Sequence, residues 1–192
     1  KNSDFGIPVK NVGVDAYDKF HFIVNNYDNL PDIVIFTTDN ALVEKKKIKK
    51  LKYIIKNIDI LKEKSGFLTG HIFKIPDNEI EHKLDIYPRT GKKVITAPIR
   101  PYDKWFNKFI KNDINVKNTF TSKKSIFAVT KDLILSNSKN FYIDILNQIE
   151  KYSIEGHDSE VPHYLELAYV EIFCKNKKEL MYHDFKTYGD IT

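Results

Sequence analysis

The sequence predicts a single α/β domain in which a largely parallel central sheet is flanked by helices. The unbroken apolar run 33–36 has the composition of a strand buried on both faces, and 125–130 is the second clear strand. Stretches with helical periodicity lie between and around them, and this alternation is typical of a parallel sheet. The chain has 192 residues, 42% of them hydrophobic, and contains no linker rich in Pro, Gly or Ser. We therefore expect one domain spanning 1–192.

The individual elements follow from periodicity, caps and breakers. Ser138 has the residue type that caps a helix, and Pro162 suits the first position of the last one. The lysine-rich stretch 42–60 predicts an amphipathic helix whose lysines form its solvated face. The expected helices are 15–27, 42–60, one beginning near 102, a single turn at 132–135, 138–152 and 162–174; short strands are expected at 67–68 and 71–73, followed by an irregular stretch to about 93.

Composition narrows the class of protein. Cys174 is the only cysteine, so no intramolecular disulfide forms, and we expect a reducing, cytoplasmic compartment. No apolar run approaches the roughly 20 residues of a membrane-spanning helix. The net charge of +5 comes almost entirely from lysine, with Arg89 and Arg100 as the arginines. Because arginine is the usual residue for bidentate phosphate and guanine contacts, we favour a solvated lysine surface over a nucleic-acid partner.

Two groups of residues could carry chemistry. Asp39 follows the first strand in Thr37-Thr38-Asp39-Asn40, where a carboxylate could bind a divalent cation or a ribose hydroxyl, or could cap a helix starting near Ala41. His163 and Glu166 are three residues apart on one helix face, where they could act as general base or bind metal, or could form an ordinary polar helix end. Both pairs of alternatives remain open at this point.

Other nucleotide signals are weak or absent. Asn11-Val12-Gly13-Val14-Asp15 precedes the first helix and could contact a phosphate or nucleoside, although such patterns are also common turns. The sequence contains no Gly-Lys-Ser/Thr phosphate loop, no Gly-x-Gly-x-x-Gly turn and no Gly-x-Ser-x-Gly elbow. These absences remove the commonest nucleotide hydrolase, dehydrogenase and esterase classes.

Three segments together resemble a known family. They are Asn11 to Asp15 with the run Asn26-Tyr27-Asp28-Asn29-Leu30-Pro31-Asp32, Ser125 to Thr130, and His163-Tyr164-Leu165-Glu166. In this order they resemble the unknown-function, glycosyltransferase-like domains of bacteria, fungi and large DNA viruses, which are similar to GT-A glycosyltransferases. The resemblance implies a GT-A-like fold and sugar transfer from a nucleotide diphosphate to a hydroxyl acceptor on a glycan or glycoprotein, assisted by manganese or magnesium.

The resemblance also implies residue roles. Asp39 would bind the metal or nucleotide; Asn11, Gly13 and Asp15 would line the nucleotide pocket; Glu166, with His163 beside it, would deprotonate the acceptor; and Tyr102 and Trp105 could stack on an acceptor sugar.

The chain departs from the family pattern at several positions. Val14-Asp15 replaces the Arg-Glu of the family, and Leu167 replaces the Arg that follows its glutamate. Thr37-Thr38-Asp39 is found where the family pattern would be a full Asp-x-Asp. Compared with the family, the chain also starts after the position of the first two strands. The departures favour a second hypothesis, a non-catalytic module that retains the fold and binds a glycan or partner chain.

Overall fold

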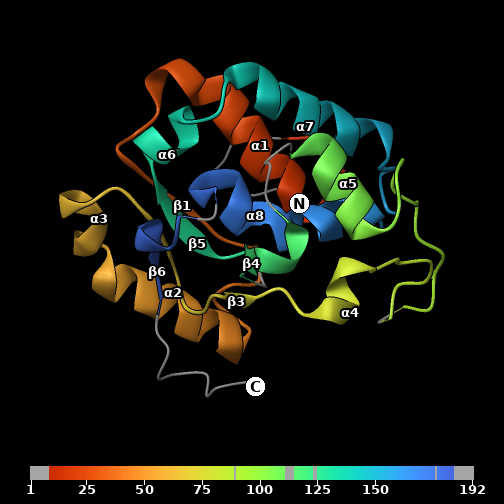
Figure 1. The fold of residues 1–192 in the computed structure, drawn as a ribbon, viewed down its shortest axis with the longest axis horizontal. Coiled ribbons are helices and arrows are strands. Elements are labelled where there is room, and N and C mark those ends of the chain that lie inside the picture. The colour runs from red at the N-terminus through yellow and green to blue at the C-terminus, as the bar shows by residue number, and fades with distance from the viewer. Residues whose placement is uncertain (1–8, 89, 111–114, 123–124, 176, 184–192) are drawn as a thin grey trace.

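The computed structural model describes residues 9–88, 90–110, 115–122, 125–175 and 177–183. Over these residues the fold is α/β, with a four-stranded sheet and helices on both of its faces (Figure 1). The strands of this sheet are β1 (Ile33–Phe36), β5 (Phe127–Thr130), β2 (Phe67–Thr69) and β6 (Met181–Tyr182), in that spatial order. A separate pair consists of β3 (Phe73–Lys74) and β4 (Phe120–Thr121).

The expected helices are present with some different boundaries, and a short helix at 77–80 lies within the stretch that was expected to be irregular. The α-helices are α1 (Val14–Asn26), α2 (Lys45–Asn57), α3 (Asp59–Glu63), α4 (Asp77–Ile80), α5 (Tyr102–Phe109), α6 (Lys131–Leu135), α7 (Lys139–Lys151) and α8 (Glu160–Cys174), and the 3-10 turns are η1 (Tyr27–Asn29), η2 (Val116–Asn118) and η3 (Lys178–Leu180).

Three local predictions can be compared with these boundaries. Ser138 caps α7 as predicted, because its hydroxyl accepts a hydrogen bond from the Phe141 amide at 3.2 Å. The single helix expected at 42–60 is instead two, divided at Ile58. Pro162 is the third residue of α8 rather than the first, a position in the first turn whose amide also has no partner within the helix.

The prediction of a largely parallel sheet is wrong. β5 pairs antiparallel with both β1 and β2, and within the described residues the parallel pairing of the sheet is that of β2 with β6. β5 is buried at all four positions, but Ile35 on β1 is 42% exposed, as expected of an edge strand. A short buried run is typical of any strand covered on both faces, so it carries no information about strand direction.

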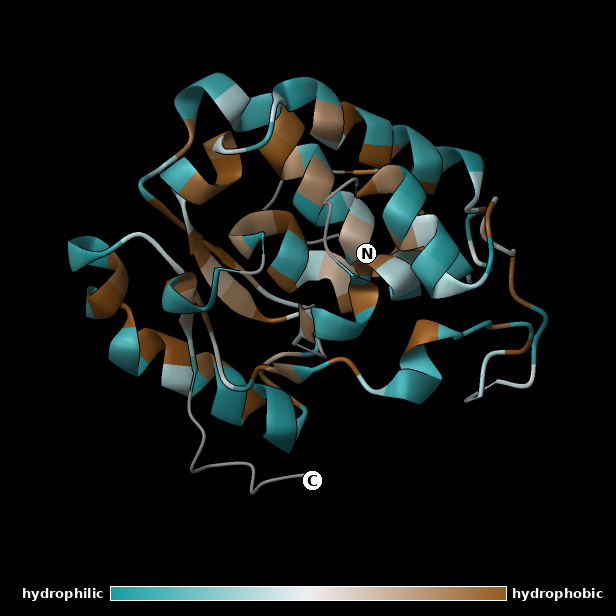
Figure 2. Ribbon diagram, in the orientation of Figure 1, coloured by the Kyte–Doolittle hydropathy of each residue, from teal (hydrophilic) through white to brown (hydrophobic). Residues whose placement is uncertain are grey.

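The sheet separates two hydrophobic clusters. Phe67, Phe127 and Val129 point toward α1, α7 and α8 in the larger cluster, while Leu68, Ile126 and Ala128 point toward Ile54 of α2 in the smaller one. Figure 2 shows α2 with hydrophilic and hydrophobic residues alternating along one border of the molecule. Within the described ranges no helix is both long and apolar enough to cross a membrane.

Candidate active site at the carboxyl edge of the sheet

Strand direction defines one edge of the sheet as the place where several chain segments meet. β1 and β2 are both antiparallel to β5, and β6 is parallel to β2, so β1, β2 and β6 share one direction. Phe36 and Thr69, which end β1 and β2, are both in register with Phe127, which begins β5. The segments that follow these strands therefore leave the sheet at one edge, which we call the carboxyl edge. Ligands in open α/β sheets bind at such an edge.

Asp39 lies in the turn by which the chain leaves β1 at this edge. The Ala41 amide donates to the Thr38 carbonyl at 3.0 Å, and the Thr38 hydroxyl donates to the Asn40 side-chain oxygen at 3.0 Å. Asp39 is exposed. The alternative that it caps a helix starting near Ala41 is wrong, because α2 begins at Lys45 with Glu44 as its N-cap residue.

The fit of a divalent cation depends on how many protein ligands it needs. Among the residues that the structure describes, no three His, Cys, Asp or Glu side chains lie close enough together to hold a metal ion. Magnesium is commonly bound through one or two carboxylates, with substrate phosphates and water completing its shell. Asp39 fits the role of such a single carboxylate ligand. The described residues do not offer a site in which protein side chains alone would surround the ion.

The residues before α1 lie at the start of a helix that packs against α7. Gly13 adopts φ +63°, and a Cβ there would overlap the Ile149 side chain, so this position needs glycine for both reasons. Asn11 is exposed. Asp15 pairs with Lys19 one turn later at 2.7 Å, and the Lys19 side chain is only 4% exposed.

The Asp15–Lys19 pair brings the start of α1 close to α8. The Lys19 ammonium lies 5.9 Å from the centre of the Tyr169 ring, and that ring is 5.1 Å from Phe127 at the carboxyl edge. Burial raises the pKa of Tyr169 well above its usual value, and the carboxylates of Asp15 and Glu166 raise it further. Through Lys19, Asp15 thus lies near the buried Tyr169 phenol of α8.

His163 and Glu166 share a face of α8, as their spacing predicts, and both are half-buried. Burial lowers the pKa of the His163 imidazole, and the Glu166 carboxylate partly opposes this shift. The His163 ring packs against Tyr87 with centroids 5.5 Å apart. The lowered pKa keeps the imidazole neutral at pH 7 and makes it a weaker proton acceptor than an exposed histidine.

Tyr102 and Trp105 are placed differently from the sequence expectation of an acceptor platform. Both side chains are 0% exposed and pack with Tyr164 in the core, at centroid distances of 5.5 Å and 5.6 Å respectively. The Trp105 indole donates to Gln148 of α7 at 3.1 Å. Neither ring presents a face on which a sugar could stack.

A polar group that sequence reasoning missed lies on the α2 side of the same edge. Lys50 is 4% exposed, and its ammonium donates to the Ser122 hydroxyl at 3.2 Å. The hydroxyls of Ser122 and Thr69 are 2.9 Å apart, and Thr69 donates to the Ile126 carbonyl at 2.9 Å. Burial, together with the charge of Lys50, lowers the pKa of His71. One signal was present in the sequence: Lys50 is one turn from Ile54, on the inward face of the helix.

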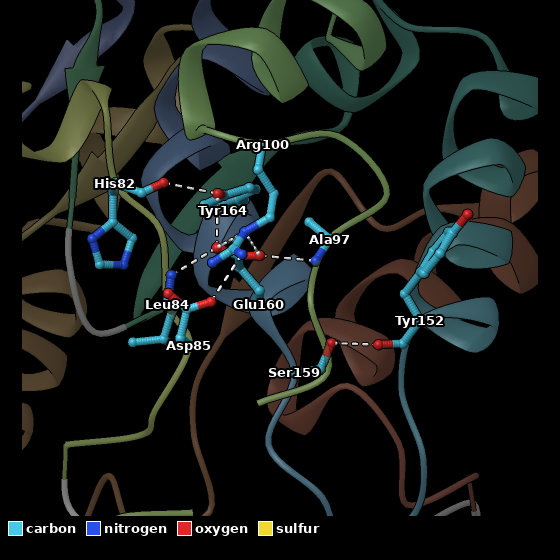
Figure 3. A network of polar contacts seen from close by, with 9 residues as sticks. All are labelled: His82, Leu84, Asp85, Ala97, Arg100, Tyr152, Ser159, Glu160 and Tyr164. Carbon is cyan, nitrogen blue, oxygen red and sulfur yellow. Dashed lines mark hydrogen bonds and ion pairs between the residues drawn. The ribbon is translucent and has the colours of Figure 1, made fainter. Parts of the chain in front are cut away.

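A second buried network anchors the long segment between α4 and α5 (Figure 3). The Glu160 carboxylate, 0% exposed, accepts from the Leu84 amide at 2.7 Å, the Ala97 amide at 2.8 Å and the Tyr164 hydroxyl at 2.8 Å. It also pairs with the Arg100 guanidinium at 2.8 Å, which in turn contacts Asp85 at 2.9 Å. These donors hold the Glu160 carboxylate in place, so its role is to anchor this segment.

The opposite edge of the sheet carries a shallow hollow lined by residues such as Asp32, Ser65, Lys131 and Asp132. Burial alone would raise the pKa of Asp132, but hydrogen bonds from Ser65, Thr130 and backbone amides lower it. Asp132 is therefore held by its own protein partners.

These features define the protein as an α/β domain whose sheet is flanked by helices. Charged groups, Lys19 and Lys50, lie on the two faces of the sheet at one edge. A family model described as "Protein of unknown function (DUF3431)" matches residues 2–186, so the chain belongs to this family. No curated protein and no solved structure matches the chain.

Proposed function

We propose that this protein transfers a sugar from a nucleotide-diphosphate donor to a hydroxyl acceptor at the carboxyl edge. The observation that carries the proposal is the buried Lys50 at this edge, where the Asp39 turn leaves β1. Lys50 lies on the α2 face of the sheet and is 4% exposed, whereas Lys19 on the α8 face is already paired with Asp15. Ammonium groups at a strand edge favour an anionic ligand such as a diphosphate.

In the proposed reaction each residue has one task. The acceptor oxygen forms a bond to the anomeric carbon of the donor while the bond from that carbon to the diphosphate oxygen breaks. Lys50 stabilises the negative charge of the leaving diphosphate, and the Glu166 carboxylate takes the acceptor proton, with His163 beside it as the second candidate base. A divalent cation, when bound through Asp39, would supply further neutralisation of that charge.

The second candidate is a non-catalytic module that binds a glycan or a partner chain. It is favoured by the sequence at the exposed Asp39 turn, where Thr37 stands in place of the first carboxylate of an Asp-x-Asp pair. One carboxylate gives a weaker metal site than two do. The two candidates differ in donor binding and turnover.

Isothermal titration of UDP and GDP, with and without manganese, tests the donor site. We expect at least one nucleotide to bind more tightly with manganese, and Asp39→Asn to weaken that binding by about tenfold or more, the scale of one charged contact. Asp144→Asn is the matched control, because Asp144 is an exposed carboxylate on α7. A folded protein that binds neither nucleotide contradicts the proposal.

A Lys50→Met variant tests the carrying observation. It should weaken nucleotide binding with or without manganese, since the ammonium acts directly on the diphosphate. Far-ultraviolet circular dichroism must first show that the variant is folded, because Lys50 is buried. Unchanged binding in a folded Lys50→Met variant would remove Lys50 from the donor site.

A further inference from the structure

The turn before α2 exposes two adjacent aliphatic side chains. Leu42 is 76% and Val43 is 81% exposed, the highest values for large hydrophobic residues within the described part of the chain. Scattered exposed aliphatic residues are common on soluble proteins, but this pair forms one tip at the end of a helix. We call Leu42 and Val43 the apolar tip.

The helix that follows carries an unbalanced positive charge. Within Lys45–Asn57, the sequence KKKIKKLKYIIKN contains lysines at 45, 46, 47, 49, 50, 52 and 56 and no acidic residue. Four of the exposed lysines follow the spacing i, i+4, i+7, i+11 and so share one face of the helix. We call Lys45, Lys49, Lys52 and Lys56 the basic stripe.

The charges of the basic stripe are not neutralised locally. None of its four lysines forms an ion pair within the part of the chain that the structure describes. Like charges one turn apart oppose each other, so the stripe weakens the helix that carries it. The opposite face of α2 packs Ile54 at 0% exposure against the sheet, which orients the stripe outward.

We propose that the apolar tip and the basic stripe form a docking surface for an anionic lipid membrane. Phosphatidylserine-type headgroups would neutralise the stripe, while Leu42 and Val43 would enter the boundary between headgroups and acyl chains. Exposed Ile55, three residues after Lys52, adds apolar surface beside the stripe. A nucleic acid would match the stripe but would offer the aliphatic tip no apolar phase. This inference does not depend on the proposed sugar transfer.

Docking in this way would place Asp39, three residues before Leu42, near the membrane surface. The carboxyl edge of the sheet would then open close to the lipid headgroups. The helix α2 lies along one border of the molecule, so it can approach a flat surface without the other helices intervening (Figure 1).

Co-sedimentation with vesicles tests the proposal. The protein is mixed with vesicles of phosphatidylcholine alone and of phosphatidylcholine with phosphatidylserine, at about 0.1 M and about 0.5 M salt. We expect binding to the anionic vesicles that weakens at the higher salt. A lysine near an anionic surface contributes roughly fivefold, so Lys49→Gln/Lys52→Gln/Lys56→Gln should weaken binding on the order of a hundredfold.

Three matched variants separate charge, apolar contact and general effects. The same three lysines changed to Arg should keep the binding, because the charge is retained. Leu42→Ser/Val43→Ser should weaken it by about tenfold or more. The control Lys92→Gln/Lys104→Gln/Lys108→Gln removes the same charge from exposed positions elsewhere and should change binding by less than about threefold.

Several outcomes would overturn the proposal. These are the absence of binding to anionic vesicles, binding that survives the glutamine substitutions in the stripe, and stripe-dependent binding to a DNA or RNA oligonucleotide with none to vesicles. Self-association that the Leu42→Ser/Val43→Ser variant abolishes, without vesicle binding, would assign the tip to a second copy of the chain instead.

Discussion

Replacing Glu160 by alanine should remove much of the stability of the fold. The buried carboxylate accepts from the amides of Leu84 and Ala97 and from the Tyr164 hydroxyl, and it pairs with Arg100. An unsatisfied buried donor costs about 1–3 kcal/mol, so the Leu84 and Ala97 amides together amount to at least about 2 kcal/mol. The Tyr164 hydroxyl keeps an acceptor in the His82 carbonyl at 2.8 Å. The unpaired Arg100 charge adds less to the loss of stability than a fully buried charge would, because its side chain is 23% exposed and keeps its ion pair with Asp85. We expect a loss of about 3–5 kcal/mol in the free energy of unfolding.

Urea unfolding, followed by circular dichroism and by the fluorescence of Trp105, measures this loss. The free energy of unfolding of a domain of this kind is about 5–15 kcal/mol, so the variant should be marginally stable but its unfolding still measurable. Glu160→Gln keeps the shape and one acceptor oxygen and should lose about 1–3 kcal/mol. Exposed Glu155→Ala is the control and should stay within about 0.5 kcal/mol of the parent. A Glu160→Ala loss below about 1 kcal/mol would refute the reasoning that this network anchors the segment from Leu84 to Arg100.

Three further changes have expected outcomes. Ser138→Ala should cost about 1 kcal/mol in urea unfolding, because it removes the cap of α7, and no loss would contradict the cap seen at Phe141. Gly13→Ala should cost about 2–4 kcal/mol, because it combines a positive φ with overlap at Ile149, and an unchanged midpoint would exclude that overlap. Burial lowers the pKa of His163, so as the pH drops through about 6.5 the unfolded chain takes up a proton before the folded one does, and the free energy of unfolding falls. His163→Gln should therefore lose less stability than the parent between about pH 7 and pH 5. Identical pH profiles of the two proteins would contradict this.

Sequence reasoning succeeded where the signal was local. The helical period of α1, the buried run of β5 and the Ser138 cap each depend on a few neighbouring residues, and each lies where it was expected. The helix expected from 42 to 60 was wrong at its ends, because α2 begins at Lys45, after a turn, and ends at Asn57.

The features that sequence reasoning missed depend on contacts between distant parts of the chain. The direction of β5 is fixed by its pairing with strands about 60 to 90 residues away, which periodicity cannot encode. Trp105 looked available for stacking because aromatic residues serve both cores and binding sites, and only its contact with Gln148 shows which applies. Lys50 was hidden within a lysine block, although its partners Ser122 and Thr69 bury it.

Two of the predicted site residues lie on one helix face in the structure. His163 and Glu166 share a face of α8, and Asp15 pairs with Lys19, whose ammonium lies 5.9 Å from the Tyr169 ring on the same helix. Asp39 lies in the turn after β1, where the strand order places a ligand edge. Their roles in sugar transfer remain the proposal that turnover must test.

The most direct test of sugar transfer is the release of UDP or GDP from nucleotide sugars in the presence of manganese and a panel of hydroxyl acceptors. We expect release that depends on an acceptor, and a loss of about 10²- to 10⁴-fold in Glu166→Gln with donor binding unchanged, because a general base contributes on that scale. Donor binding without release from any acceptor, or full activity in Glu166→Gln, would contradict the proposed transfer and its assigned base.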